Sequence, residues 1–358
     1  MSKQSSRKDE HIVHALNFHV DTSSSDFSQT RFIHHSFPEI NVTDVNLQTT
    51  LSPLTLDTPF FINAMTGGSN MSKQVNQDLA ILARETHLAM ATGSLSIALK
   101  DPNVANSFSI ARQINPDGVI FANLGAHHSI DNAKKAVEIC QADALQIHVN
   151  TPQELAMQEG ERQFSGWLHN IEQIVNALHV PIIVKEVGFG MSRETVQALY
   201  AIGVRIVDVS GVGGTNFAQI EHARANEQFE KVSSQRTDFL IDWGQSTLIS
   251  LLEANSLSQK PTLIASGGIK NALDIAKCLC LGANAVGISG QILYTLHHYG
   301  INHTIDYVMQ LKEQLRTIMT LLGAKTVAQL QTKQILVAPS IQNWCSARQI
   351  DWMHYANR

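Results

Sequence analysis

Apolar and polar positions along the chain follow two alternating periodicities. Eight short apolar runs rich in β-branched residues lie at 60–64, 89–92, 119–123, 145–150, 181–185, 206–210, 262–266 and 285–288. Between them, apolar residues recur every three or four positions at 75–87, 131–139, 167–178, 192–202 and 272–281. The short runs predict buried strands and the longer segments predict helices. Eight such units predict a parallel sheet, and we expect an α/β fold closed into a (β/α)8 TIM barrel. A doubly wound open sheet is the alternative, but it would leave a long open edge.

Several segments lie outside this repeat but belong to the same single domain, 1–358. Residues 1–11 form a polar arm, which is either a solvated tail or a short helix with Arg7 and His11 on one face. Residues 31–58 mix apolar and turn residues and predict a small hairpin before the barrel. Residues 217–238 are charged and poor in apolar groups, which favours a long mobile loop over the mouth or, alternatively, a solvated surface helix.

The C-terminal part and two helix starts complete the prediction of elements. Helical periodicity returns at 307–322 and 327–330, and we expect these helices to close the barrel. Ser192 and Asn271 stand directly before two predicted helices, where their side chains would act as N-caps.

Composition narrows the possible partners. The 358 residues carry a net charge of −5 and are 44% hydrophobic, so the chain can bury a large core and has no overall field that attracts nucleic acid. An anionic small-molecule ligand would have to be held by local groups. The four cysteines have no metal-ligand spacing and no segment has about 20 consecutive apolar residues. We therefore expect a cytoplasmic protein with no nucleic-acid or membrane partner.

Glycine and small polar residues follow nearly every predicted strand. Examples are Gly67-Gly68, Gly93-Ser94, Gly213-Gly214, Gly267-Gly268 and Ser289-Gly290. In a TIM barrel the carboxyl ends of the strands line the mouth, and glycine lets backbone amides approach a ligand closely. The loops after strands seven and eight commonly bind phosphate, so these glycines predict a phosphate site there.

The run 145–150 predicts a ligand site at the same mouth. Strand side chains alternate between two faces, which places Gln146, His148 and Asn150 together and the apolar residues on the other face. Gln153 and Glu154 follow at once. Glu154 has no second carboxylate nearby and is a plausible Mg²⁺ ligand, since Mg²⁺ often uses one carboxylate together with ligand phosphates and water. The histidine pairs lack HxxxH spacing, which argues against a transition metal.

Lys185 ends the fifth run. Because side chains alternate along a strand, Lys185 and Glu186 point to opposite faces of the sheet. If Lys185 points inward, Glu186 needs a partner on the helical side. A structural ion pair around Lys185 is the alternative. A fixed cation near a phosphate site fits a flavin, because a reduced flavin ring is anionic and needs a positive group nearby.

The motifs of the chain resemble those of type 2 isopentenyl-diphosphate isomerases, in the same order. They are Arg7-Lys8-Asp9-Glu10-His11, Ala64-Met65-Thr66-Gly67-Gly68, Thr92-Gly93-Ser94, Asn123-Leu124-Gly125, His148-Val149-Asn150-Thr151-Pro152-Gln153-Glu154, Val184-Lys185-Glu186-Val187-Gly188, Ser210-Gly211-Val212-Gly213-Gly214-Thr215 and Ser266-Gly267-Gly268-Ile269. The match runs from the N-terminal arm to about residue 323. The glycine motifs alone also fit other FMN barrels, whereas the arm joined to HxNxxQE is specific.

The resemblance implies a set of site residues. Those that would contact FMN are Ala64, Met65, Thr66, Ser94, Asn123, Lys185, Ser210, Thr215, Gly267, Gly268, Ile269, Ser289 and Gly290. Those that would bind the diphosphate substrate are Arg7, Lys8, His11, Ser94, Ser96, His148, Asn150 and Gln153, with residues 1–11 as a mobile arm. Glu154 would hold Mg²⁺. Many members have an arginine where this chain has Ser96, which can donate a hydrogen bond but no charge.

The resemblance also implies the reaction, the interconversion of isopentenyl and dimethylallyl diphosphate in isoprenoid biosynthesis. Reduced FMN would act in the proton transfer, Gln153 would orient it, and Lys185 would stabilise the reduced ring. NADPH would serve only to reduce FMN, and relatives tend to be homotetramers. Two alternatives stay open: an FMN-dependent 2-hydroxy acid oxidoreductase and a flavin-binding protein without catalysis. The oxidoreductase would need a histidine base and an arginine clamp, and the stretch leading into Ser266-Gly267-Gly268-Ile269-Lys270 has neither.

Overall fold

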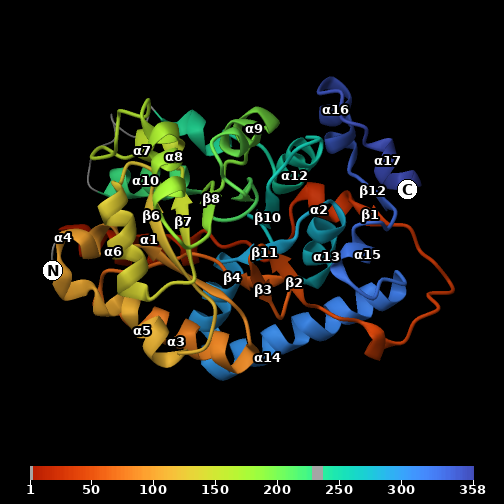
Figure 1. The fold of residues 1–358 in the computed structure, drawn as a ribbon, viewed down its shortest axis with the longest axis horizontal. Helices are drawn as coiled ribbons and strands as arrows, with labels where there is room; N and C mark the ends of the chain where they lie inside the picture. The colour runs from red at the N-terminus through yellow and green to blue at the C-terminus, as the bar shows by residue number, and fades with distance from the viewer. Residues whose placement is uncertain (1–2, 228–236) are drawn as a thin grey trace.

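The computed structural model describes residues 3–227 and 237–358. In this part of the chain, eight parallel strands close into a barrel in chain order (Figure 1). They are β4 (Phe60–Ile62), β5 (Met90–Ser94), β6 (Ile120–Gly125), β7 (Ala144–His148), β8 (Ile182–Lys185), β9 (Ile206–Asp208), β10 (Thr262–Ser266) and β11 (Ala285–Ile288). The predicted TIM barrel is confirmed, and the open sheet is wrong because β11 pairs with β4.

Helices cover the outside of the barrel. The longer ones are α3 (Asn70–Thr86), α5 (Asn106–Ile114), α6 (Ile130–Cys140), α8 (Trp167–Ala177), α9 (Arg193–Ala201), α12 (Thr247–Asn255), α13 (Ala272–Cys280) and α14 (Gly290–Leu321). Shorter ones are α2 (Ser25–Gln29), α4 (Ser96–Lys100), α7 (Thr151–Ala156), α15 (Val327–Leu330), α16 (Pro339–Ala347) and α17 (Met353–Asn357), with 3-10 turns η1 (Val42–Asp44), η2 (Pro102–Val104) and η3 (Asp238–Asp242). Ser192 and Asn271 are N-caps as predicted, because their side chains accept from the backbone N–H of Thr195 and Asp274.

The inside of the barrel is built in two layers. An apolar layer takes one side chain from each strand, in chain order Phe61, Ala91, Phe121, Ala144, Ile183, Ile206, Ile264 and Ala285. Two residues further along every strand the inward position is polar or glycine, namely Asn63, Gly93, Asn123, Gln146, Lys185, Asp208, Ser266 and Gly287. We call this second set the polar layer. Because inward positions recur with period two, the polar layer forms the floor of the mouth.

The hairpin before the barrel is smaller than predicted. Within 31–58, only β2 (Thr49–Leu51) and β3 (Leu54–Leu56) pair with each other. Leu51 and Leu56 pack on the apolar layer, so the hairpin closes the amino end of the barrel. The first strand of the segment, β1 (Arg31–Phe32), pairs with β12 (Ile335–Leu336) near the C-terminus instead.

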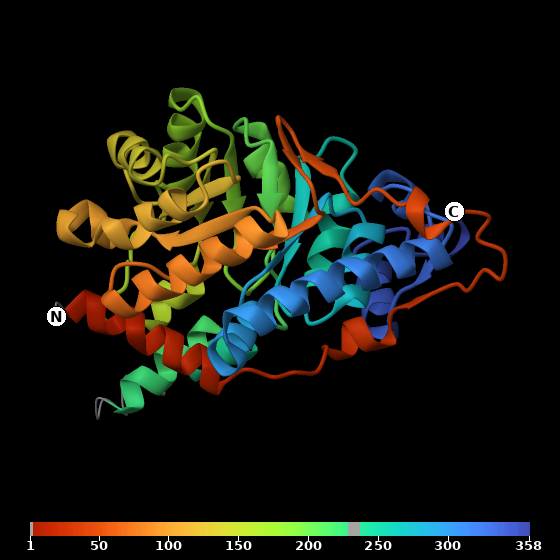
Figure 2. The same cartoon turned by 90° about the horizontal axis from the view of Figure 1, so that it is seen from below.

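For two segments at the carboxyl end of the barrel, the structure decides between the alternatives that the sequence left open. The polar arm is part of a longer helix, α1 (Lys3–Asn17), which packs against α3, α10 and α14 (Figure 2). The predicted mobile loop 217–238 begins as a helix, α10 (Phe217–Glu227), in which Glu221 and Arg224 are buried, so this part is neither a loop nor fully solvated. Residues 228–236 of that prediction lie outside the described residues.

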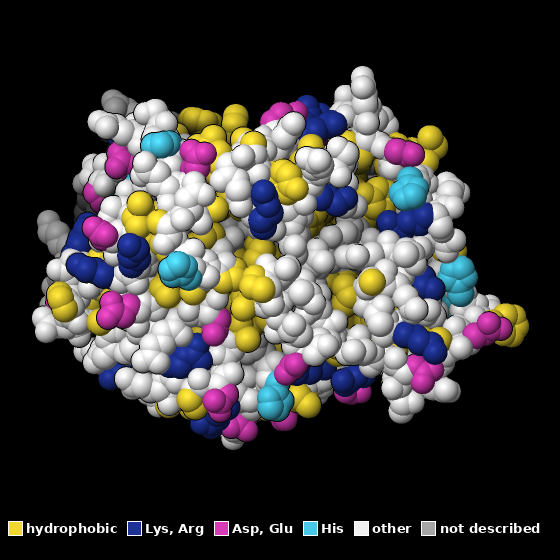
Figure 3. Space-filling model, viewed as in Figure 1, with side chains coloured by type: hydrophobic (Ala, Val, Ile, Leu, Met, Phe, Trp, Pro, Cys, Tyr) yellow, Lys and Arg dark blue, Asp and Glu magenta, His cyan; other side chains and the backbone are white. Residues whose placement is uncertain are grey.

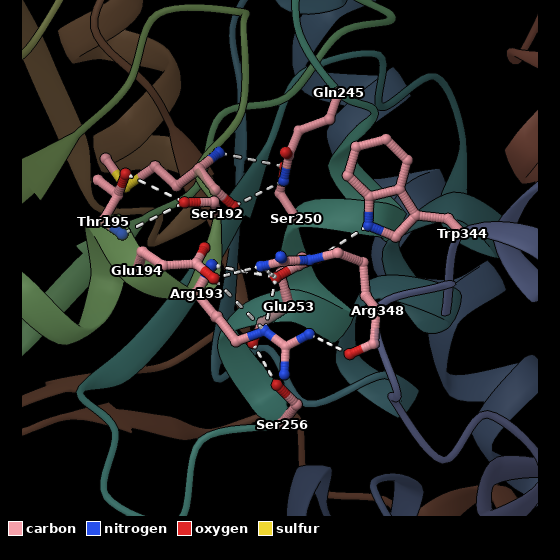
Figure 4. Close-up of polar contacts among 11 residues, drawn as sticks. Ser192, Arg193, Glu194, Thr195, Gln245, Ser250, Glu253, Ser256, Trp344 and Arg348 are labelled. Carbon is pink, nitrogen blue, oxygen red and sulfur yellow. Dashed lines mark hydrogen bonds and ion pairs between the residues drawn. The ribbon is translucent and has the colours of Figure 1, made fainter. Parts of the chain in front are cut away.

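A buried carboxylate ties the C-terminal segment to the barrel (Figure 4). Glu253 on α12 is fully buried and accepts hydrogen bonds from Arg193 on α9 and from Trp344 and Arg348. The C-terminal residues are therefore held to the outer helices rather than across the mouth.

Charged side chains of both signs are interspersed over the face seen in Figure 3, in line with the small net charge. All four cysteines are buried free thiols. Among the helices of residues 3–227 and 237–358, none combines the length and the apolar run that a bilayer crossing needs.

Candidate active site

Two adjoining cavities open at the carboxyl ends of the strands, beneath α1. The first is lined by the loops after β4, β9, β10 and β11 and by the second half of α1. The second is lined by residues after β5, β6 and β7 and by the first half of α1. Lys8, His11, Met65 and Lys185 line both cavities, so ligands in the two would meet.

Glycine loops form the wall of the first cavity. Gly268 has a φ of +77°, and a Cβ on it would lie 2.8 Å from the backbone of Gly213 in the facing loop. A side chain at this position is therefore excluded by conformation and by space. The two loops pack backbone against backbone and expose peptide groups where β10 ends, which is the arrangement expected for phosphate.

Two polar residues of the first cavity have unusual features, one in its side chain and one in its backbone. Thr66 Oγ1 is buried with no hydrogen-bond partner among the described residues. Ser210 has a φ of +33°, which is a strained conformation for a residue with a side chain. Such groups fit a flavin nucleotide rich in hydrogen-bonding atoms. All the predicted cofactor contacts line this cavity except Ser94 and Asn123, which line the second.

Lys185 lies buried in the polar layer between the cavities, so the inward orientation that the sequence left open is the one observed. Its Nζ donates to the Glu186 carbonyl oxygen at 2.7 Å. Burial lowers the pKa of Lys185, while Asp208 and Glu186 oppose that shift. The Glu186 carboxylate accepts instead from the backbone N–H groups of Val187 and Phe189, both at 2.6 Å. The Glu186 carboxylate is thus paired with the backbone of the loop that follows it. Lys185 contacts the carbonyl oxygen of Glu186 and not its carboxylate.

Asp208 is the carboxylate of the polar layer and lies beside Lys185 in the strand register. It accepts from Ser266 Oγ at 2.7 Å and from the backbone N–H of Ser210 at 3.2 Å. Burial raises the pKa of Asp208, while Lys185 and these hydrogen bonds act against the rise. The polar layer therefore contains a lysine and a carboxyl group side by side beneath the two cavities.

Gln153 is held at both ends of its amide. Its Nε2 donates to Glu221 Oε1 at 3.0 Å, and its Oε1 accepts from Asn150 Nδ2 at 3.2 Å. Glu221 also lies 2.9 Å from His11 Nε2 and pairs with Arg224. Burial alone would raise the pKa of Glu221, but His11, Arg224 and Gln153 lower it to about 2. Glu221 is thus an acceptor only, and it fixes which end of the Gln153 amide faces the cavity.

Helix α1 brings cations to the second cavity. Arg7 and Lys8 line it, and Arg7 contacts Glu159 at 3.4 Å. Burial and the neighbouring Arg7 lower the pKa of Lys8 to about 8. Asp9 and Glu10 tie the helix down through Ser69 and Arg224. Arg7 and His11 share a helical face, so the arm is a structured cover and not a solvated tail.

Ser96 lies within a hydrogen-bonded chain in the second cavity. Its Oγ lies 2.9 Å from Ser94 Oγ and 2.7 Å from His128 Nε2. Burial and the neighbouring His127 and Lys100 lower the pKa of His128 to about 4. Lys100 also lines this cavity, one helical turn after Ser96. Lys100 therefore places a cation in the second cavity close to Ser96, which has no charge of its own.

Glu154 faces the second cavity with both oxygens engaged. Oε1 accepts from Asn150 at 3.0 Å and Oε2 from the backbone N–H of Glu161 at 2.8 Å. Within residues 3–227 and 237–358, no group of three or more His, Cys, Asp or Glu side chains could hold a metal ion. A cation at Glu154 would therefore need oxygens from a ligand, which is how Mg²⁺ often binds.

The structure brings the predicted site residues together and adds two. The predicted substrate residues all line the second cavity. Gln146, placed with them by parity, is instead fully buried in the polar layer. Sequence reasoning missed Glu221 and Asp208 as site residues. The sequence contains a signal for each of them. Asp208 stands at an inward-facing position at the end of its strand, and Glu221 lies three residues before Arg224 on a predicted helical turn.

Comparison with known proteins agrees with this geometry. The profile of the FMN-dependent dehydrogenase family matches residues 100–337. Isopentenyl-diphosphate delta-isomerase of Staphylococcus saprophyticus is 48% identical over 350 residues, covering 98% of this chain and 99% of that protein. The protein of the same name from Staphylococcus aureus strain N315 is 48% identical over 345 residues, covering 96% and 97%.

Solved structures share the fold at low identity. A flavocytochrome b2 variant superposes with a TM-score of 0.63 at 18% identity, covering 96% of this chain and 81% of that one. Mandelate oxidase with (S)-2-phenylpropionate gives 0.62 at 15% identity, covering 92% and 90%. The chain therefore belongs to the FMN-dependent dehydrogenase family and, within it, to the isopentenyl-diphosphate delta-isomerases that its motifs resemble.

Proposed function

We propose that the protein, with FMN bound, interconverts isopentenyl diphosphate and dimethylallyl diphosphate. The observation that carries this proposal is the pair of cavities that share Lys185. One is a glycine-walled cavity suited to a flavin phosphate, and the other contains cations and oriented amides suited to a diphosphate. The similarity to isopentenyl-diphosphate delta-isomerases over nearly the full length supports the same reaction.

The first cavity would hold FMN through groups already in place. The loop containing Gly267, Gly268 and Ile269, together with Ser289 and Gly290, would bind the phosphate. Thr66 would gain the partner that its buried hydroxyl lacks. When bound and reduced, FMN supplies an electron-rich ring and an N–H group that can deliver a proton. The Lys185 ammonium would stabilise negative charge on that ring.

The second cavity would hold the substrate. Arg7, Lys8 and His11 would cover the diphosphate, and His148 and Asn150 would face it. Moving a double bond requires a proton to be added at one carbon and removed from another. Gln153 is barely basic, so it would orient the substrate for these transfers and not accept the proton itself. Its fixed amide, held by Glu221 and Asn150, gives it that orienting role.

We further propose that Glu154 binds Mg²⁺ together with diphosphate oxygens. NADPH would serve as a reductant that activates the protein once. We also expect a homotetramer, which sedimentation velocity would test. The 2-hydroxy acid oxidoreductase alternative is supported by the shared fold at 14–20% identity and by the FMN-dependent dehydrogenase profile, whereas the relatives at 48% identity over nearly the full length are isomerases by name.

An anaerobic assay with FMN, Mg²⁺ and isopentenyl diphosphate tests the proposal. We expect no turnover until NADPH is added, and then many molecules of the dimethylallyl isomer for each NADPH oxidised, because the reaction involves no net redox change. Equal amounts of product and oxidised NADPH would refute it. Reduced, FMN-loaded protein that forms no isomer would instead favour a flavin-binding protein without catalysis.

A pair of matched variants tests the assignment of Gln153. Gln153→Asn shortens the side chain by one methylene and withdraws the amide from Glu221 or from the substrate. We expect it to keep FMN and to lose about 100-fold or more in kcat, as is typical when a positioned group shifts by about 1 Å. Gln173→Asn makes the same change on the exposed side of α8 and should be neutral. Equal rates for the two variants would exclude the role of Gln153.

A further inference from the structure

A continuous hydrogen-bonded chain crosses the inside of the barrel and ends at the second cavity. His148 Nδ1 lies 2.8 Å from Asn123 Oδ1, and Asn123 Nδ2 donates to Gln146 Oε1 at 3.1 Å. Gln146 Nε2 donates to Asn63 Oδ1 at 3.0 Å, and Asn63 Nδ2 donates to Asp208 Oδ2 at 2.8 Å. We call these five side chains the amide relay. Four belong to the polar layer, and His148 lies one inward position above Gln146.

The direction of the amide relay is set at two points. Asp208 is the acceptor at its far end, where it also accepts from Ser266 and faces Lys185. In the middle, the backbone N–H of Ala64 donates to Asn63 Oδ1 at 2.9 Å, so this oxygen cannot exchange places with the amide nitrogen. Each amide must accept from the side chain before it and donate to the one after it.

That direction determines the state of the histidine. A reversed Asn123 would put its oxygen against the oxygen of Gln146, and a reversed Gln146 would put its oxygen against that of Asn63. The group facing Nδ1 of His148 is therefore an oxygen, which cannot donate. We infer that Asp208 is a positioning residue that fixes the tautomer of His148 through the amide relay, with the proton on Nδ1 and an unprotonated Nε2 facing the second cavity.

The surroundings of His148 agree with a neutral ring. The charged and titratable groups that face it are Lys185 from β8, Lys8 from α1, and His127 and His128 from the loop after β6. Burial, followed by these four groups, lowers the pKa of His148 well below its usual range. His148 lines the second cavity, where the lone pair of Nε2 is available to a ligand.

The consequence for the substrate rests on the proposed function. Nε2 and a phosphate oxygen are both acceptors, so a hydrogen bond between them needs a proton. That proton is either on the phosphate or on the ring. Arg7 would act on the diphosphate as a permanently charged donor and Lys8 as a donor up to about pH 8, whereas His148 would discriminate by the protonation state of the ligand. This separates its role from that of the neighbouring cations.

Gln146 offers the sharpest perturbation of the amide relay. It is fully buried and lines neither cavity, so it touches no ligand and acts on His148 only through Asn123. Gln146→Met keeps a similar volume and removes both hydrogen bonds. Thr92→Val is the matched control, because Thr92 is equally buried on strand β5, two strands away from Gln146, and its hydroxyl hydrogen-bonds to Phe121 and Cys140, outside the relay.

The measurement is nitrogen NMR of the full FMN-loaded chain with ring-labelled histidine and no substrate. The His148 signals are identified by their absence in His148→Gln. We expect the wild type and Thr92→Val to show a proton on Nδ1 alone. In Gln146→Met, Asn123 is free to turn, and we expect about a tenfold rise of the Nε2–H form.

A wild-type His148 protonated on Nε2 would overturn the inference even if the variant failed to fold. So would a folded Gln146→Met that retains the wild-type tautomer. Since no substrate is present, a failed isomerase assay leaves this result unchanged, and the two proposals can fail separately.

Discussion

Replacing Glu253 should clearly lower the stability of the fold without changing the active site. Oε1 accepts from Trp344 Nε1 and Arg348 Nε, both at 2.8 Å. Oε2 accepts from the backbone and side chain of Arg193, both at 3.2 Å, and from Arg348 Nη2 at 3.1 Å. Burial would raise the pKa of Glu253, but Arg348, Trp344 and Arg193 lower it on balance. Glu253→Gln keeps the shape and replaces one oxygen by a donor that must face other donors (Figure 4).

The size of the effect follows from burial. Removing one partner of a buried charge pair destabilises a protein by about 3 to 5 kcal/mol, and we take about 3 because both arginines are partly exposed and can be solvated again. An unfolding entropy of about 2.1 cal/mol/K for each of the 358 residues sums to about 0.75 kcal/mol/K. The expected fall in Tm is therefore about 4 °C.

Glu194→Gln is the matched control for this change. Glu194 contacts the same Arg348 at 2.5 Å, but its side chain is 61% exposed. Exposed ion pairs contribute little, so we expect a shift of less than about 1 °C. Scanning calorimetry at one fixed FMN concentration measures both, since bound ligand also moves Tm. Equal shifts for the two variants, or none for Glu253→Gln, would refute the reasoning that burial decides the energy.

Three further predictions concern the two cavities. Glu154→Gln should raise the Mg²⁺ concentration for half-maximal rate about tenfold, and the control Glu172→Gln on α8 should leave it unchanged. A titration of initial rates with Mg²⁺ measures this concentration for both variants. Because the pKa of Lys8 is lowered to about 8, kcat/KM should fall as pH rises through about 8 and the ammonium is lost, and Lys8→Arg should remove this limb from the pH profile. Gly268→Ala should abolish FMN retention after desalting, whereas Gly166→Ala, where a Cβ meets nothing within 4 Å, should keep it; a fully flavinated Gly268→Ala would contradict the phosphate-loop assignment.

The sequence predicted the strands because barrel strands are buried on both faces and form nearly continuous apolar runs. It did not predict the polar layer, because a layer joins residues from all eight strands at one height, and strand stagger is set only when the barrel closes. Gln146 illustrates the difference. Parity placed it correctly on the face of His148, but only closure shows that Asn63 and Asn123 bury it.

Helix α10 shows why the rest of the site was missed. Its charge content favours a solvated loop when it is read alone. In the fold, Arg224 compensates the charge of Glu221, and His11 from the first helix lies 2.9 Å from the same carboxylate, so a charged segment becomes a buried wall. Contacts between residues 210 positions apart leave no signal within either segment.

The two carboxylates that sequence reasoning missed carry out the same physical task for two different residues that line the second cavity, Gln153 and His148. Glu221 orients the amide of Gln153 directly, and Asp208 is inferred to orient the ring of His148 through the amide relay. In both cases a buried acceptor fixes the direction of an uncharged group, and hydrogen bonds directed in this way need no reorganisation when a ligand binds. The groups that face the substrate are then a neutral amide, an expected neutral imidazole and fixed cations. None of these is a strong acid, and protonating an unactivated alkene requires one. We therefore assign the proton transfer to the flavin in the adjoining cavity and the positioning of the substrate to the side chains of the second cavity.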